Sequence, residues 1–335
     1  MDRRPHPSNT PRFLLAAALA IALIAGLTAW LTGCGGDEST TTTAISETST
    51  TDATGSTTSE PPAEDGVFPV TVTDDTGATV TVEARPERIV ATAPANTETL
   101  FALGVGDRVV GVTTLDDYPP EVADIPKVGD FQPSAEAVIA LEPDLVVGYS
   151  GNEEPLKPVM DAGTPVLILN PTSLEGIYAN ILLVGQAVGA PTAAEDLVTS
   201  IETEVEGIST TARETGESPK VFYALDNTLW TAGPGSFVDE LLALAGATNA
   251  AAGGPEAYYQ LTPEQLVATD PDIILLPKTV FAEPDTFVGD PRFADLRAVK
   301  QGRVVVFDDV IVTRPGPRIA EGLRVLAKAI HPDAF

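Results

Sequence analysis

The sequence contains very few of the side chains that ligate transition metals or act as nucleophiles. Its 335 residues include two histidines, His6 and His331, and one cysteine, Cys34. A single cysteine excludes an intrachain disulfide, and two distant histidines do not supply the several His ligands typical of a zinc or manganese site. A Gly-x-Ser-x-Gly elbow and a Walker loop are also missing. We therefore expect no enzymatic activity, no resident metal and no cofactor.

Basic residues are scarce as well. The chain has 19 Lys and Arg against 48 Asp and Glu, which gives a formal net charge of −29. Nucleic-acid binding needs clustered cations that neutralise phosphates, so this class of partner is excluded. Two interpretations of the acidic excess stay open. It keeps the protein soluble, or it forms patches that meet a basic protein partner.

The first 33 residues are typical of a targeting segment. Arg3, Arg4 and Arg12 precede an apolar run at 13–30, "FLLAAALAIALIAGLTAW". The next four residues, "LTGC" at 31–34, resemble the lipobox of bacterial lipoproteins, in which the signal is cleaved before the cysteine and the thiol is acylated. We expect residues 1–33 to be a signal peptide and Cys34 to anchor the protein to the membrane, outside the cytoplasm. The alternative is an uncleaved anchor helix with an incidental cysteine.

Residues 34–65 consist mainly of Thr, Ser, small and acidic residues and contain no aromatic side chain. Such a segment does not bury enough apolar area to offset the entropy of ordering it. We therefore predict a disordered tether, with the folded body beginning at residue 66.

The folded body is predicted to be α/β, with two lobes on either side of one long helix. Apolar strands without alternation are typical of a parallel sheet that is buried on both faces. Apolar residues recur at steps of three and four over 192–214, which predicts an amphipathic helix about 33 Å long. We predict an N-terminal lobe over 66–190, a linking helix over 191–216 and a C-terminal lobe over 217–335. The elements expected are a β-hairpin over 68–82, strands at 88–93, 108–113, 144–149, 164–170, 220–225, 229–233 and 272–276, and helices at 96–106, 134–141, 173–190, 236–246, 262–269 and 317–330.

One stretch of the body occurs twice. Residues 131–147, "FQPSAEAVIALEPDLVV", align without a gap on residues 259–275, "YQLTPEQLVATDPDIIL", with five of 17 positions identical. Helix–turn–strand units of any α/β protein share some features, so a chance likeness is the alternative. The ungapped match favours a duplicated plan, with one copy in each lobe.

These segments carry a family resemblance. "SAEAVIALEPDLVV" (134–147) and "RPGPRIAEGL" (314–323), together with residues 87–113 and 116–129, resemble the substrate-binding proteins of bacterial ABC importers for iron–siderophore complexes, haem and vitamin B12. The resemblance implies the class III periplasmic-binding-protein fold, in which two Rossmann-like lobes with parallel-rich sheets are joined by one long rigid helix. It also implies a monomer that delivers an iron chelate or a corrinoid to a permease dimer with ATPase subunits. The rival is a surface sensor or interaction domain that has this fold but no transport role.

The resemblance implies that the repeated segments dock on the transporter. The family's vitamin B12 receptor uses one surface glutamate per lobe to dock on arginines of its permease, and the aligned residues here are Glu136 and Glu264. Ser134 and Thr262 are good N-caps, which places each glutamate in the first turn of a helix. The alternative is that each glutamate is there only because the helix dipole favours an acid.

The resemblance also implies ligand contacts from both lobes. A bulky chelate needs apolar faces and a few polar anchors, such as the planar fork of an arginine. The alternatives are core packing for each aromatic residue and a surface ion pair for the arginine. Neighbouring residues of a strand point to opposite faces, so only one of two adjacent tyrosines is expected to face the ligand. The predicted ligand-binding residues are Tyr118, Phe131, Tyr149, Trp230, Tyr258, Tyr259 and Arg314. The sequence does not choose between a siderophore chelate and a corrinoid.

Overall fold

The computed structural model describes residues 66–335. The predicted signal peptide, Cys34 and the predicted tether lie outside the described residues. Within 66–335, no helix has the length and apolar character needed to span a membrane.

The body begins with the predicted hairpin, which is confirmed. Strands β1 (Val70–Thr73) and β2 (Thr79–Val82) pair antiparallel. Asp74 closes the turn, because its Oδ1 accepts hydrogen bonds from the backbone N–H groups of Thr76 and Ala78, both at 3.0 Å. Its Oδ2 accepts from the N–H of Ile168, which ties the hairpin to the first large sheet.

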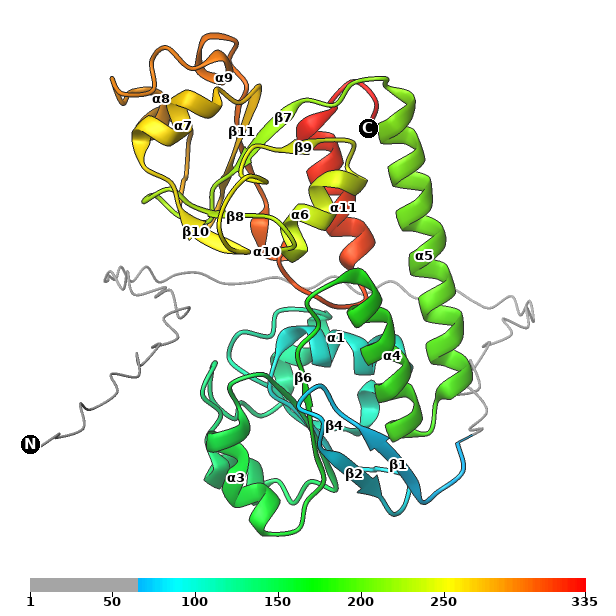
Figure 1. Ribbon diagram of the computed structural model, residues 1–335. Helices are drawn as coiled ribbons and strands as arrows, with labels where there is room; N and C mark the ends of the chain where they lie inside the picture. Colours follow the sequence, from blue (N-terminus) through cyan, green and yellow to red (C-terminus); the bar gives the residue numbers. More distant parts are fainter. Residues whose placement is uncertain (1–65) are drawn as a thin grey trace, which may run out of the picture. The chain divides into compact units, whose positions relative to one another are not determined.

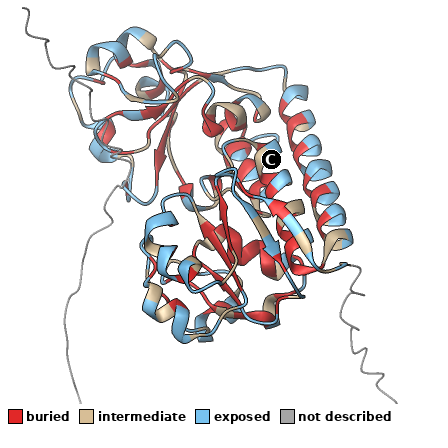
Figure 2. Cartoon of the chain, turned by 60° about the horizontal axis from the view of Figure 1, so that its bottom comes forward, coloured by how far each residue is buried: buried red, intermediate tan, exposed pale blue. Residues whose placement is uncertain are grey.

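The N-terminal lobe is built on a parallel sheet with strand order β4-β3-β5-β6. The strands are short and almost wholly buried, as expected for unalternating apolar segments with helices on both faces (Figures 1 and 2). Helix α3 was not predicted. Pro158 lies inside it, and buried Leu156 and Val159 fix it to the sheet. The elements are β3 (Ile89–Ala91), α1 (Pro94–Ala102), η1 (Gly106–Arg108), β4 (Val109–Gly111), η2 (Pro120–Asp124), α2 (Ala135–Ala140), β5 (Leu145–Tyr149), α3 (Glu153–Asp161) and β6 (Val166–Leu169).

Two helices follow this lobe, α4 (Leu174–Val188) and α5 (Pro191–Glu214). Gly189 ends α4 in the left-handed region at φ 76°, and the chain turns back at once into α5. The predicted long helix is confirmed as the 24 residues of α5, which pack against α4, α6 and α11 (Figure 1).

The C-terminal lobe repeats the plan with the parallel order β12-β11-β7-β9. A separate antiparallel pair, β8 and β10, lies outside this sheet. The elements are β7 (Lys220–Tyr223), β8 (Trp230–Ala232), α6 (Phe237–Leu244), β9 (Thr248–Asn249), β10 (Tyr258–Gln260), α7 (Pro263–Thr269), β11 (Ile273–Pro277), α8 (Asp285–Val288), α9 (Arg297–Lys300), β12 (Val304–Phe307), α10 (Asp309–Val312) and α11 (Ile319–Ile330). The predicted fold class, two α/β lobes with parallel sheets and one long helix, is confirmed.

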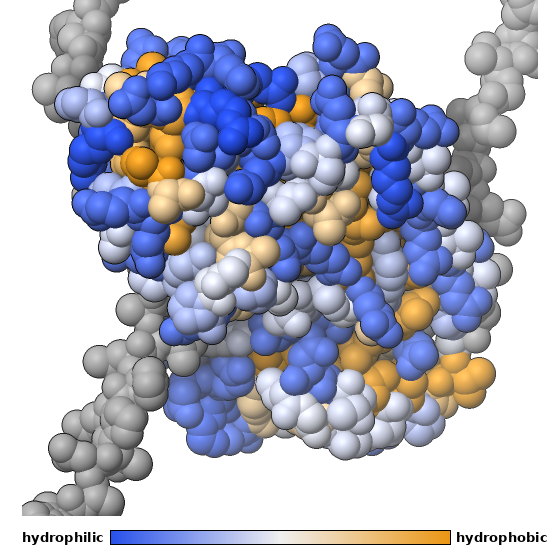
Figure 3. All heavy atoms as spheres, turned by 45° about the horizontal axis from the view of Figure 1, so that its top comes forward, coloured by the Kyte–Doolittle hydropathy of each residue, from blue (hydrophilic) through white to orange (hydrophobic). Residues whose placement is uncertain are grey.

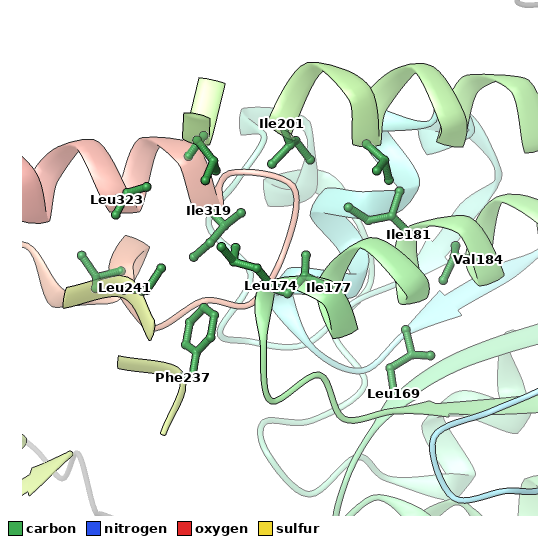
Figure 4. Close-up of a cluster of buried hydrophobic side chains, with 14 of the residues drawn as sticks. Leu169, Leu174, Ile177, Ile181, Val184, Ile201, Phe237, Leu241, Ile319 and Leu323 are labelled. Carbon is green, nitrogen blue, oxygen red and sulfur yellow. The ribbon is translucent and has the colours of Figure 1, made fainter. Parts of the chain in front are cut away.

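One apolar core runs through both lobes. Leu174 and Ile177 of α4 meet Ile201 of α5, and the same cluster contains Phe237 of α6 and Leu323 of α11 (Figure 4). The side chains in this cluster come from segments more than 100 residues apart, so the two lobes share it, while each lobe also has a smaller apolar cluster of its own. Burial of this shared surface holds the two sheets to the long helix.

Candidate ligand and docking sites

The two copies of the repeat begin with the predicted helix caps. Ser134 Oγ accepts a hydrogen bond from the Ala137 N–H at 3.2 Å and begins α2. Thr262 Oγ accepts from the Gln265 N–H at 3.2 Å, while Gln265 Oε1 accepts from the Thr262 N–H at 2.7 Å. Pro263 takes the first helical position of α7, where its missing N–H has no intrahelical partner to lose. The caps at both helices are therefore confirmed.

Each cap is followed by an exposed acid in the first turn, Glu136 in α2 and Glu264 in α7. The backbone N–H of Glu136 lowers the pKa of its carboxyl, and a hydrogen bond from the Ser134 hydroxyl at 3.1 Å lowers this pKa further. The carboxylate of Glu264 is one of the charges that raise the pKa of Arg292, after those of Asp290. Helix α7 and helix α3, against which α2 packs, both lie on the side of the body away from α5 (Figure 1). Docking through these acids stays a prediction.

A small cavity marks the junction of the two lobes. It has a volume of about 10 Å³ and is lined from the N-terminal lobe by Asn96 and Tyr149 and from the C-terminal segment by Pro315 and Gly316. Such a volume holds about one water molecule, whereas drug-sized ligands occupy about 300–1,000 Å³. A bulky ligand at this junction therefore contacts the side chains around the cavity rather than entering it, unless the lobes move apart.

Four of the predicted aromatic residues are exposed: Tyr118, Phe131, Trp230 and Tyr258. Phe131 is the most exposed, at 70%. Trp230 and Tyr258 share one face of the β8–β10 ladder, because Gln260 pairs with Trp230 and Tyr258 lies two residues before Gln260. Most of the face drawn in Figure 3 is polar, with apolar residues in separate patches.

Hydrogen bonds and electrostatic interactions connect these aromatic residues to the lobe junction. Buried Asn152 accepts a hydrogen bond from the Tyr149 N–H at 3.2 Å and donates to the Phe131 carbonyl at 3.1 Å. Burial raises the pKa of the half-buried Tyr149, and Tyr258 from the other lobe raises it further. The structure therefore brings Phe131, Tyr149 and Tyr258 into one neighbourhood. The sequence analysis missed Asn152, which no local motif marks.

The adjacent tyrosines of β10 have different surroundings. The Tyr259 hydroxyl donates to the Ala251 carbonyl at 2.9 Å, and its ring lies so close to Gly254 that a Cβ there would fall 2.1 Å from ring atoms. Tyr259 also packs against the second apolar cluster of the C-terminal lobe. Tyr258 is therefore the member of this pair that stays available to a ligand, while Tyr259 packs within its lobe.

Arg314 lies at the centre of an ion-pair cluster that joins the two lobes. Its Nη1 donates to Glu98 Oε1 and to Asp117 Oδ1, both at 2.7 Å. Arg318 lies 3.7 Å from Glu98 Oε1, binds Glu321 at 2.9 Å and stacks on the Tyr118 ring at 4.0 Å. The sequence analysis missed Glu98 and Asp117, because residues about 200 positions apart give no local signal that they will pair.

Burial sets the electrostatics of this cluster. The Glu98 side chain is 1% exposed, and its Oε2 is buried without a hydrogen-bond partner. Desolvation raises the pKa of Glu98, and the opposing hydrogen bond and charge of Arg314 do not cancel this effect. Burial lowers the pKa of Arg314, but the hydrogen bonds and charges of Asp117 and Glu98 outweigh it, and the pKa of Arg314 is raised.

The raised pKa of Glu98 predicts a pH-dependent stability. A carboxyl with a raised folded-state pKa stabilises the fold fully below its ordinary value of 4.5, and loses that contribution as pH rises through the folded value. The side chain introduced by Glu98→Gln does not titrate. The Tm of this variant is therefore expected to rise relative to that of the wild type as the pH increases from 4.5 through the folded-state pKa of Glu98. One pKa unit is worth about 1.4 kcal/mol, and each 1 kcal/mol shifts Tm by about 2–4 °C. Thermal melts of both proteins from about pH 4 to about pH 8 measure this; a constant difference in Tm contradicts it.

A larger pocket lies in the C-terminal lobe, beside the turn between β7 and β8 and the start of α7. Its volume is about 540 Å³, and buried Phe281, Phe287 and Phe293 line it together with Gln260 and Arg292. None of the predicted ligand residues lines this pocket, and the sequence analysis did not predict it. No group of three or more His, Cys, Asp and Glu side chains within 66–335 is arranged to hold a metal ion.

Comparisons with known proteins match most of the body to one family. Residues 89–311 match the family model described as periplasmic binding protein. An uncharacterized ABC transporter substrate-binding lipoprotein of Bacillus subtilis, YvrC, is 38% identical over 278 residues, 80% of this chain and 88% of that protein. A cobalamin-binding protein of Halobacterium salinarum is 30% identical over 281 residues, 79% of this chain and 74% of that protein. The solved apo form of the periplasmic heme-binding protein RhuT of Roseiflexus sp. RS-1 is 33% identical with a TM-score of 0.67, covering 74% of this chain and 99% of that one.

Proposed function

This chain belongs to the periplasmic binding protein family, and we propose that it captures an iron–siderophore chelate or a corrinoid between its lobes and delivers it to an ABC importer. In this proposal Cys34 is acylated after removal of residues 1–33 and holds the protein on the outer side of the cell membrane. The body acts as a monomer. It takes part in binding and delivery and not in catalysis.

The observation that carries the proposal is the set of exposed aromatic residues contributed by both lobes. Tyr118 and Phe131 come from the N-terminal lobe, and Trp230 and Tyr258 from the C-terminal lobe. Exposed rings present broad apolar faces, which a corrinoid or a wrapped iron chelate needs more than it needs protein ligands to the metal. The relatives named for cobalamin and heme binding support a bulky metal complex of this kind.

Delivery depends on the two acids at the helix starts. Glu136 and Glu264 are exposed, follow side-chain caps and occupy equivalent positions of the repeat. We propose that each pairs with an arginine on one half of a permease dimer, so that the two-lobed body meets a partner made of two equivalent halves. No feature of residues 66–335 favours the rival role as a sensor without transport.

Ligand titration tests the capture step. Trp230 is the one tryptophan outside the predicted signal peptide, so its fluorescence reports on the aromatic set. For a protein that begins at residue 35, we expect cyanocobalamin, heme or a ferric siderophore to quench Trp230. At about 100-fold excess over Kd, the ligand stabilises the fold by about 2.7 kcal/mol, or roughly 5–10 °C in Tm.

The variant Tyr258→Ala is expected to weaken this binding at least about 10-fold through loss of a stacking face. Val267→Ala, which removes another exposed apolar side chain on the same lobe, is the control and is expected to bind normally. If no complex of these classes quenches Trp230 or raises Tm at about 1 mM, a concentration at which even weak specific ligands bind, the proposed capture function is wrong.

A further inference from the structure

We propose that the junction between the lobes accepts metal complexes that are neutral or positively charged and discriminates against polyanionic ones, because Glu98 and Asp117 already pair with Arg314. This inference rests on the proposed function and narrows its ligand class. Three hydroxamates cancel the charge of a ferric ion, and cyanocobalamin is uncharged. Three catecholates leave a ferric complex triply negative, and heme carries two carboxylates.

The first support is the geometry at Arg314. One nitrogen, Nη1, donates to carboxylates of Glu98 and Asp117 at 2.7 Å each, and the side chain is only 13% exposed. Glu98 is 1% exposed, so a ligand does not displace it without opening the body. Asp117 is 64% exposed and is the carboxylate that an incoming anion would have to replace. An anion that bound at Nη1 would therefore exchange one carboxylate for another, and an anion that bound at the other guanidinium nitrogens would still meet the charges of Glu98 and Asp117.

The second cation of the cluster, Arg318, is also paired with a carboxylate. The guanidinium of Arg318 is paired with Glu321 at 2.9 Å and covers the ring of Tyr118 at 4.0 Å. Two guanidinium groups thus face three carboxylates, those of Glu98, Asp117 and Glu321. The cluster has more carboxyl groups than guanidinium groups, on a chain whose net charge is already −29.

The remaining predicted ligand residues point to the same selectivity. They are aromatic and carry no charge at neutral pH; burial raises the pKa of Tyr149 and of Tyr258, which keeps both hydroxyls protonated. Aromatic faces attract cations and apolar surface and do not compensate an anion. The junction therefore offers stacking and hydrogen bonds, while the charge of the arginine that the family resemblance places in it is already opposed by two carboxylates.

The test compares complexes of different charge on the same protein, using quenching of Trp230 and the rise in Tm. The probes are cyanocobalamin, a ferric trihydroxamate, a ferric tricatecholate and heme. We expect cyanocobalamin or the trihydroxamate to bind at least about 10-fold more tightly than the tricatecholate and heme. A 10-fold loss of affinity is about what one unfavourable charge–charge contact in a binding site costs. Equal or tighter binding of a polyanionic complex would overturn the inference and leave the proposed function intact, whereas failure of all four would overturn both.

Removing the competing carboxylates tests the cause. The double variant Glu98→Gln/Asp117→Asn frees Arg314 and is expected to strengthen binding of the tricatecholate or heme about 10-fold or more, with less than about 3-fold change for the neutral complexes. The matched control is Asp196→Asn/Glu204→Gln, which makes the same charge change on the exposed face of α5 and is expected to leave all affinities unchanged. If the double variant does not fold, Asp117→Asn alone carries the test, since that side chain is exposed. A folded variant without any gain for the anionic complexes refutes the role given to Arg314.

Discussion

Replacing Glu136 and Glu264 together with alanine is expected to abolish ligand uptake while ligand affinity stays within about 2-fold of the wild type. Both side chains are exposed, and neither contacts the aromatic set or the Arg314 cluster in the contacts described above. Loss of both carboxylates removes the two charge-assisted pairs with the permease, and each such pair at an interface is worth about 1.5 kcal/mol or more. Uptake by cells that carry the variant, measured beside ligand titration of the purified protein, separates docking from capture.

A matched control uses two other exposed acids. Glu204→Ala with Glu206→Ala makes the same charge change on α5, away from the capped helices, and is expected to leave uptake unchanged. Single variants should lose part of the uptake, because each leaves one pair in place. Reduced ligand affinity in the double variant, or uptake that persists, would show that these glutamates are there only because the helix dipole favours acids.

The second large effect concerns the core shared by the lobes. Leu323→Ala is expected to lower the free energy of unfolding by about 2–5 kcal/mol, because the side chain is fully buried and its removal leaves a cavity. Leu323 belongs to the cluster that also contains Leu174 and Ile177 of α4 and Ile201 of α5 (Figure 4). Both lobes should therefore lose stability together, in one cooperative transition.

Urea unfolding with two probes measures this effect. Trp230 fluorescence reports the C-terminal lobe, and hydrogen exchange at the buried strand β5 reports the N-terminal lobe. The two transitions should shift by the same amount in Leu323→Ala, and Val267→Ala on the surface should change stability by no more than about 0.5 kcal/mol. A transition that shifts only in the C-terminal lobe would show that the lobes have independent cores.

Structural features that depend on residues close together in the sequence were predictable from it. The hairpin around Asp74, the caps at Ser134 and Thr262 and the periodicity of α5 each depend on residues a few positions apart, and the structure confirms all of them. The sequence analysis did not predict α3. Proline inside a helix costs a backbone hydrogen bond, and burial of Leu156 and Val159 against the sheet offsets the loss at Pro158.

The composition and local patterns of this sequence were enough to determine an acidic α/β protein with two similar lobes, a long connecting helix and an exposed acid at the start of each repeated helix. Only the tertiary structure decided which aromatic side chain of β10 is exposed and which partners Arg314 takes. Strand alternation separates Tyr258 from Tyr259, but only packing in the C-terminal lobe selects the side that faces solvent. The pairing of Glu98 with Arg314 joins residues 216 positions apart, and electrostatic attraction over that separation exists only once the shared core has brought the two segments together.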